Sequence, residues 1–480
     1  MRKGLIVLLA AVLVAAFALP AMADLKTSGF VRIKARQQQN YQTTGSSGGL
    51  FILPVKDAPT QSFVEQRQRF IFDWDTENAG ARAQFEMDFQ AWGDSAYTVA
   101  RNQGAGLEAD SINLETKSFY IWFNVPNTSL KVTAGLQNVS DVYDGVILGL
   151  ADMAGIFLTG KMEPVSYRLG LAKFQENTTR FDDDVDFYIA EAKFSPTKEA
   201  KIGLNLYVLR DAAGGAPSTG ASNSNLATAA SRLLIDYGQV LTTFNYTPSI
   251  FYYIGLDGSL QAGPAALSGW FFYNTGKLEQ ANITINGIPS SVNADVDVKA
   301  WAAQLRADLN LGPGKFFLAG AYVTGTKDTD TDFKSPIVGN NYALAGSYPL
   351  YKWDLQILFP NGDDINNSSA LAYDVQNKGR GIMAFAAGYS QKFSDQLSGK
   401  IGLGYLADAE NAIGSPVKKH KAIEVNAKVN YQLVKGVDLG LHGAFASLTD
   451  WENYGTTGVA NLAQDADDIF TFYARLNYGF

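Results

Sequence analysis

In residues 81–92 (ARAQFEMDFQAW), apolar and polar side chains alternate along almost the whole segment. Successive side chains of a β-strand point to opposite faces, so the pattern predicts a strand with one apolar face and one polar face. Such a strand separates an oily medium from water. The alternation alone fits both a soluble sandwich and a membrane barrel, so strand length and the connections must decide between them.

The same alternation recurs in residues 201–208, 251–261 and 420–432. Most predicted strands have about 9–14 residues. A tilted strand needs roughly 9–11 residues to cross the hydrocarbon core, whereas strands of globular sheets have about 5–6. The lengths favour an all-β, transmembrane, antiparallel up-and-down barrel. We count 18 strands, the first near residues 28–39 and the last at residues 468–480, with 16 as the alternative; an even number is expected.

The predicted connections are alternately short and long. The short ones are at residues 76–80, 126–129, 163–164, 195–199, 262–264, 312–314, 394–396 and 434–436. The long ones are at residues 40–62, 93–114, 138–154, 175–184, 211–250, 276–294, 327–379, 408–420 and 448–467. Residues 233–244 and 348–359 are interpreted as parts of these long connections. Outer-membrane barrels have tight periplasmic turns and longer external loops, so the asymmetry favours the membrane.

The N-terminus predicts export. A short basic head precedes an apolar run at residues 4–19, and the sequence AMA at residues 21–23 is a small-residue cleavage site. These are the parts of a secretory signal peptide. We therefore expect residues 1–23 to be removed and residues 24–480 to form the barrel.

Composition limits the partners and cofactors. The formal net charge is −8, which argues against nucleic acid as a partner, because that role calls for a basic surface. The chain has no cysteine, so it has neither disulfides nor a haem-attachment or zinc motif built on cysteine. The acidic run at residues 327–333 lacks the glycine and glutamate of a calcium loop. We expect no cofactor and no specific metal site.

After residue 23 the chain resembles the Gram-negative outer-membrane porin family over its whole length. The resemblance is carried by the opening strand GFVRIKAR (29–36), the hairpin RQRFIFDWDTENAGARAQFEMDF (67–89) and the terminal NYGF (477–480). It implies a general or mildly selective porin, through which small hydrophilic solutes and ions diffuse passively in a water-filled pore. It also implies a homotrimer, contact with outer-membrane lipid and lipopolysaccharide, and a third external loop folded into the barrel. Barrels of 16–18 strands leave an aqueous channel, in agreement with this function.

Basic residues gather on the polar face of the first three predicted strands: Arg32, Lys34, Arg36, Arg67, Arg69 and Arg82. Adjacent strands are about 4.8 Å apart, so these residues form one basic wall. The mostly apolar third loop (138–154) carries Asp141, Asp144 and Asp152. The resemblance implies that this acidic loop faces the basic wall across the constriction.

An alternative is that the basic residues pair with acids of the same strands and stabilise the wall: Glu65, Asp73, Glu86 and Asp88.

Three other classes of function compete with the diffusion pore: an outer-membrane enzyme, an energised transporter with an internal plug, and a sleeve around another protein. An outer-membrane enzyme needs a positioned nucleophile and base, but the only histidines, His420 and His442, lie in no nucleophile motif. We therefore expect no enzymatic activity. A barrel that acts as a sleeve or scaffold for a partner, such as a secreted cytochrome, is compatible with the sequence and is the alternative function.

Overall fold

The computed structural model describes residues 24–43, 52–93, 104–106, 114–177, 181–213, 241–285, 288–327, 330–342, 348–359, 370–372, 377, 379–411, 419–453 and 461–480. The expected signal peptide at residues 1–23 lies outside this part of the chain. Within these ranges, no helix has the length and apolar character needed to cross a membrane.

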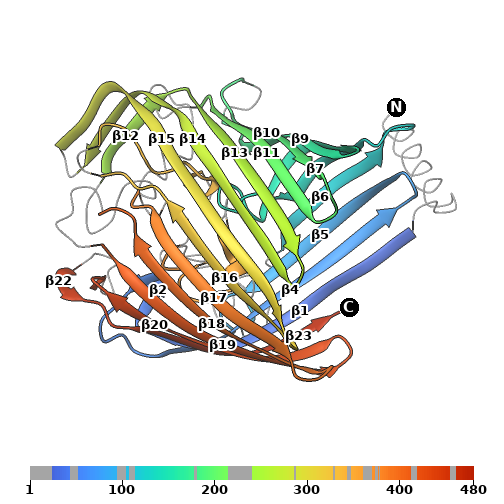
Figure 1. Ribbon diagram of the computed structural model, residues 1–480. Helices are drawn as coiled ribbons and strands as arrows, with labels where there is room; N and C mark the ends of the chain where they lie inside the picture. Colours follow the sequence, from blue (N-terminus) through green and yellow to red (C-terminus); the bar gives the residue numbers. More distant parts are fainter. Residues whose placement is uncertain are drawn as a thin grey trace, which may run out of the picture.

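Eighteen antiparallel strands close into a single barrel within the described residues (Figure 1). Each pairs with its neighbours in the ring, and the last strand pairs with the first, which closes it. The ring strands are β1 (Asp24–Gln39), β4 (Gln61–Asp75), β5 (Ala79–Phe89), β6 (Glu115–Asn124), β7 (Lys131–Val139), β8 (Ala151–Met162), β9 (Val165–Gln175), β10 (Val185–Phe194), β11 (Ala200–Asp211), β13 (Ser249–Ala262), β14 (Ala265–Ile285), β15 (Ile288–Leu311), β16 (Gly314–Val323), β17 (Ile382–Lys392), β18 (Leu397–Asp408), β19 (Lys421–Val434), β20 (Val437–Thr449) and β23 (Ile469–Gly479). The predicted fold class and strand number are confirmed.

Five short strands lie outside the ring. They are β2 (Tyr41–Thr43), β3 (Ile52–Pro54), β12 (Leu241–Thr247), β21 (Glu452–Asn453) and β22 (Asn461–Asp465). The predicted short connections form tight turns at the end of the barrel where β1 begins and β23 ends (Figure 1). We call this the short-turn end.

The barrel has apolar side chains on its outer face and polar side chains on much of its inner face. On β19, Glu424 and Asn426 are buried, whereas Ile423 and Val425 between them are exposed. The outward residues of β23 repeat this pattern: Phe470, Phe472, Leu476 and Tyr478. An exposed apolar belt on a closed sheet is the surface that a bilayer requires, because closure leaves no backbone group unpaired in the hydrocarbon.

One predicted loop is wrong. The described residues within 276–294 are strand instead of a long connection: β14 runs to Ile285, β15 begins at Ile288, and these two residues pair. The β-branched residues of this segment suit an extended backbone. Part of the predicted connection 211–250 is also strand, because β12 pairs with β14, but β12 adds no strand to the closed ring.

Two connections fold into the barrel and form an apolar core there. Loop 3 comprises residues 140–150, and loop 7 comprises the described residues of 324–381, including the 3-10 turns Gly339–Asn341 and Tyr351–Trp353. The ring of Tyr143 in loop 3 packs on Tyr207 of β11 at 5.7 Å and on Phe272 of β14 at 5.1 Å. The inward fold expected of the third loop is therefore present.

Loop 7 is bonded to loop 3 through the backbone. The N–H of Gly339 donates to the carbonyl of Ile147 at 2.7 Å, and the N–H of Tyr348 donates to the carbonyl of Gly145 at 3.0 Å. Residues 348–359, expected in an external loop, are instead largely buried inside the barrel. Their apolar side chains would lose this burial in water, which is why the loop folds inward.

Candidate pore and its charged wall

Strand pairing places four of the six basic residues of the wall directly beside an acid. Lys34 of β1 is the register partner of Glu65 on β4, and Arg69 of β4 is the partner of Glu86 on β5. Opposite charges on neighbouring strands stabilise a sheet, whereas like charges in register destabilise it. Arg32 departs from this rule, because its partner on β4 is Arg67.

The pairs are close ion pairs. The guanidinium of Arg67 binds Asp88 through two bonds, Nε to Oδ1 at 2.7 Å and Nη2 to Oδ2 at 2.5 Å, and it reaches Glu86 Oε1 at 3.3 Å. Glu86 also accepts a hydrogen bond from Arg69.

The other basic residues of the wall are paired as well. Arg82 Nε lies 2.7 Å from Asp73, and Lys34 Nζ and Arg36 Nη2 each lie 3.4 Å from Glu65. The structure therefore places these basic residues beside the acids of the pairing alternative, Glu65, Asp73, Glu86 and Asp88.

The cations of the wall are more exposed than their partners. The side chains of Arg67 and Arg69 are 18% and 31% exposed, whereas those of Glu86 and Asp88 are 1% and 4% exposed. Because the carboxylates lie beneath the guanidinium groups, the surface that faces the lumen at these pairs is positive. Lys34 and Arg36 are buried and contribute little to that surface.

The loop acids do not all face this wall. Both carboxylate oxygens of Asp141 accept backbone N–H bonds from loop 3 itself, between 2.6 and 2.9 Å, from Tyr143, Gly145, Ile147 and Leu148. Burial raises the pKa of Asp141 to about 6, although these four N–H groups stabilise its charged form. Asp141 therefore stabilises the turn of loop 3, because the backbone N–H groups of this tight turn need an acceptor.

Asp144 and Asp152 bind different parts of the barrel. Asp144 Oδ2 accepts from Gln304 Nε2 of β15 at 2.7 Å, and its other oxygen pairs with Lys352 of loop 7. Asp152, at the start of β8, lies 2.7 Å from Lys117 of β6. Lys117 in turn lies 3.6 Å from Glu86, so Asp152 extends the charged wall across β6.

The sequence pattern did not identify Lys117 or the buried carboxylate Glu424 as functional residues. Lys117 could have been identified from the sequence, because it lies two residues from Glu115 and therefore shares the polar face of the same predicted strand. Glu424 of β19 is buried and accepts backbone N–H bonds from Gln356, Ile357 and Leu358 of loop 7, at 2.7, 2.9 and 2.9 Å. No sequence pattern indicates this contact, because the docking of a loop on a distant strand depends on the tertiary fold.

Both histidines are buried among polar groups. His420 Nδ1 lies 3.0 Å from Arg380 Nη1, and His442 Nδ1 lies 2.8 Å from the Tyr473 hydroxyl. In the part of the chain that the structure describes, no group of three or more His, Cys, Asp or Glu residues could hold a metal ion.

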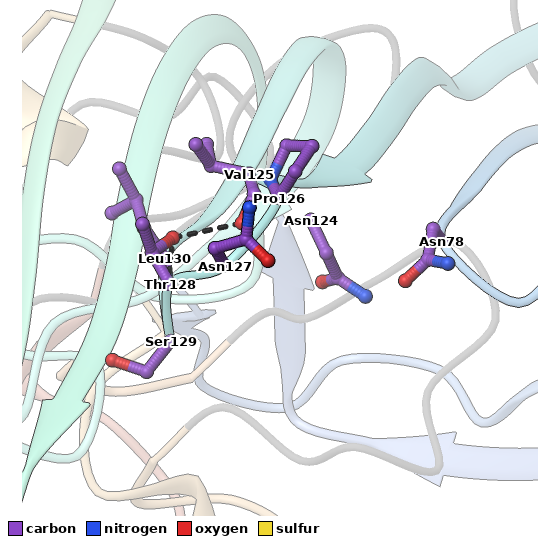
Figure 2. Close-up of a pocket in the computed structure, with 8 residues that line it drawn as sticks. All are labelled: Asn78, Asn124, Val125, Pro126, Asn127, Thr128, Ser129 and Leu130. Carbon is purple, nitrogen blue, oxygen red and sulfur yellow. Dashed lines mark hydrogen bonds between the residues drawn. The ribbon is translucent and has the colours of Figure 1, made fainter.

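A polar hollow of about 570 Å³ lies at the short-turn end, beside the turns that follow β4 and β6 (Figure 2). Its lining is Asn78, Asn124, Val125, Pro126, Asn127, Thr128, Ser129 and Leu130. The backbone of the turn is closed by a 2.8 Å bond from Val125 N–H to Leu130. None of these side chains titrates near neutral pH, so the hollow offers neither an acid nor a base.

Residues 274–472 match a family model described as the porin subfamily. The fold is similar to OccAB4 of Acinetobacter baumannii (TM-score 0.51, 11% identity, covering 96% of this chain and 99% of that chain). It is also similar to OccK9 (OpdG) of Pseudomonas aeruginosa (TM-score 0.51, 12% identity, 95% and 98% covered) and to OccK1 (OpdK) of the same organism (TM-score 0.50, 10% identity, 95% and 98% covered). No curated protein matches the sequence.

Residues 274–472 are therefore similar to the porin subfamily, and the whole chain shares the fold of OccAB4 and OccK9. Loops 3 and 7 form an apolar core with inward residues of β10–β19, and partly exposed polar side chains remain on the charged wall of β1 and β4–β6.

Proposed function

We propose that solutes pass along the charged wall and that its arginines make the pore anion-preferring. The chain is then a porin for the passive diffusion of small hydrophilic solutes. Its proposed pore-lining set is Arg32, Lys34, Arg36, Arg67, Arg69 and Arg82, of which Lys34 and Arg36 lie buried behind the exposed arginines. The observation that supports this proposal is the unequal exposure within the ion pairs, since Arg67 and Arg69 reach the lumen while Glu86 and Asp88 are buried. Charged groups around a narrow aqueous path set its selectivity, and arginine favours anions.

The three loop acids have separate roles in this proposal. Asp152 lines the path, because it belongs to the Lys117–Glu86 network. Asp141 and Asp144 shape the constriction indirectly, since one holds the turn of loop 3 and the other joins it to β15 and loop 7.

Single-channel recording tests the function. The purified porin is reconstituted in a planar bilayer, and the reversal potential is measured across a salt gradient. We expect open channels with a reversal potential on the anion side. A preparation that folds but forms no channels would overturn the diffusion function. Open channels with a cation preference would overturn the proposed role of the wall.

The finer features of the porin are proposals with their own tests. Cleavage after residue 23 is tested by the mass of the membrane-extracted protein, and a homotrimer by cross-linking in intact outer membranes. Exposed loop acids such as Asp182 suit cation-bridged contact with lipopolysaccharide.

We also propose that the chain has no catalytic activity, which a lipase assay tests. A sleeve for a partner protein is less favoured, because the porin's own loops form a core inside the lumen.

A further inference from the structure

Two lysines lie side by side in the lumen near the short-turn end. Lys400 of β18 and Lys428 of β19 are direct register partners. Both are mostly buried, with Lys428 the more buried of the two. Like charges in register destabilise a sheet unless an anion lies between them. An anionic group between Lys400 and Lys428 is therefore needed to stabilise this part of the sheet.

Loop 7 supplies that anion. Asp354 Oδ2 lies 2.7 Å from Lys400 Nζ, and Oδ1 pairs with Lys428 Nζ. The carboxylate thus bridges the two ammonium groups with one oxygen each. Any small oxyanion with two free oxygens, whether a carboxylate or a phosphate, could make the same pair of contacts.

The bridge is accessible. The Asp354 side chain is 33% exposed and lines a cavity of about 480 Å³ at the short-turn end. Besides the bridged pair, the cavity is lined by Lys315 and Lys392, so its lining carries four lysines and one carboxylate. This excess of positive charge attracts small anions to the position that Asp354 occupies.

Asp354 can leave without releasing the rest of loop 7. Its backbone is in the left-handed region (φ 58°), a conformation that aspartate tolerates better than most residues, at the end of the 3-10 turn Tyr351–Trp353. The next firm contacts begin two residues later, where Glu424 holds three backbone N–H groups of residues 356–358. Exchange of one side chain is therefore a local event.

We propose that Lys400 and Lys428 form a binding site for solute oxyanions, and that Asp354 is a tethered competitor that occupies the site when no solute is bound. The proposal rests on the porin function and adds a defined site to it. An incoming carboxylate or phosphate displaces the Asp354 carboxylate and takes over both lysine contacts. As the solute leaves, Asp354 returns, which prevents the lysine pair from trapping the solute.

Equilibrium binding to the full-length porin in detergent tests the site. Radiolabelled phosphate and succinate are measured separately, at constant ionic strength, for wild type, Asp354→Asn and Lys400→Gln/Lys428→Gln. A tethered group competes at an effective concentration in the millimolar range. For ligands that bind with millimolar affinity, removal of the Asp354 charge should therefore lower the Kd by about twofold or more, and removal of the lysines should abolish this gain. The matched control is Asp308→Asn, because Asp308 is also a partly exposed carboxylate that pairs with a cation, Arg306, but it lies on β15 and does not contact the lysine pair in the described structure.

The outcomes separate the site from the channel. Tighter binding of phosphate, succinate or both to Asp354→Asn supports the site and identifies the chemistry it takes. Unchanged or weaker binding overturns it, as does an equal gain in Asp308→Asn, which would indicate a general change in lumen charge. Channel formation is recorded from the same preparations, with folding checked by migration of the unboiled protein on a gel. Absence of channels from folded wild type would overturn the porin function, whatever the binding result.

Discussion

Arg67 and Arg69 illustrate how an ion pair can still leave a net field in the lumen. Each is paired, yet the carboxylates beneath them are almost fully buried. The parity of the strand pattern was enough to predict which residues point inward. The pattern also indicated the nearby acids, but not which acid pairs with which arginine, because this depends on the offset between strands, and one residue of slip changes every pair.

The first prediction concerns these two arginines. Replacement by glutamine at both positions should shift permeability toward cations, because the negative charges of Glu86 and Asp88 are then no longer balanced by the two arginines. One unit charge at 4 Å contributes about 1 kcal/mol in water, so the permeability ratio should change by about fivefold or more. The reversal potential in a salt gradient measures this change. The shift should shrink at 1 M salt, where the Debye length is about 3 Å.

Lys161→Gln is the control for that experiment, since Lys161 is an exposed basic residue at the end of β8 and pairs only with its neighbour Glu163. It should leave the reversal potential close to that of wild type. Equal shifts in the control and in the double variant would mean that the wall does not set the selectivity.

Asp141 provides a pH prediction. Its pKa is raised by burial to about 6, above its unfolded value near 3.8. Between about pH 4 and pH 6 the folded state therefore binds more protons than the unfolded state at this group. Its contribution to stability is fully present below that window and is lost as the pH rises through about 6. Infrared difference spectra of wild type against Asp141→Asn should show a carboxyl band that titrates near pH 6. A midpoint near 4 would contradict the assignment.

At the scale of the elements, strand periodicity predicted the membrane-crossing segments well and the regions beyond them poorly. β14 and β15 continue past the expected end of their hairpin, because the pattern for crossing the membrane says nothing about where a strand stops outside it. Residues 348–359 were interpreted as external for a similar reason. A loop that folds back into its own barrel is stabilised by contacts with distant strands, such as those of Glu424, which no local pattern encodes.

The register of β5 gives a prediction at this scale. Phe85 packs beside Phe72 on the outer surface, whereas Gln84 lies on the opposite face of the strand. An arginine at position 85 should therefore cost about 2–4 kcal/mol at the bilayer midplane. An arginine at position 84 should be tolerated. Unfolding by denaturant in lipid vesicles compares the two variants, and equal losses of stability would refute the assigned faces.

At the scale of the whole molecule, closure of the ring is the property on which membrane stability depends. β23 closes the ring, since its Leu476 pairs with Ile33 of β1 on one side and with Leu439 of β20 on the other. In the hydrocarbon, every backbone group left without a partner costs several kcal/mol, so one break at this seam affects the entire barrel. The outward aromatic face of β23 predicted its place in the membrane, but its two partners follow only from the closed topology.

The last prediction tests this seam. Leu476→Pro removes a backbone donor from the closing strand, and proline is excluded from the middle of a sheet. Wild type should migrate faster unboiled than boiled, because the closed hydrogen-bonded barrel resists detergent. The proline variant should lose most of the fast-migrating form. Leu476→Ala is the matched control: it truncates the same outward side chain but keeps the N–H group, and it should retain the fast form. Loss of that form in both variants would attribute the effect to the side chain, and its retention in both would show that the seam tolerates a missing hydrogen bond.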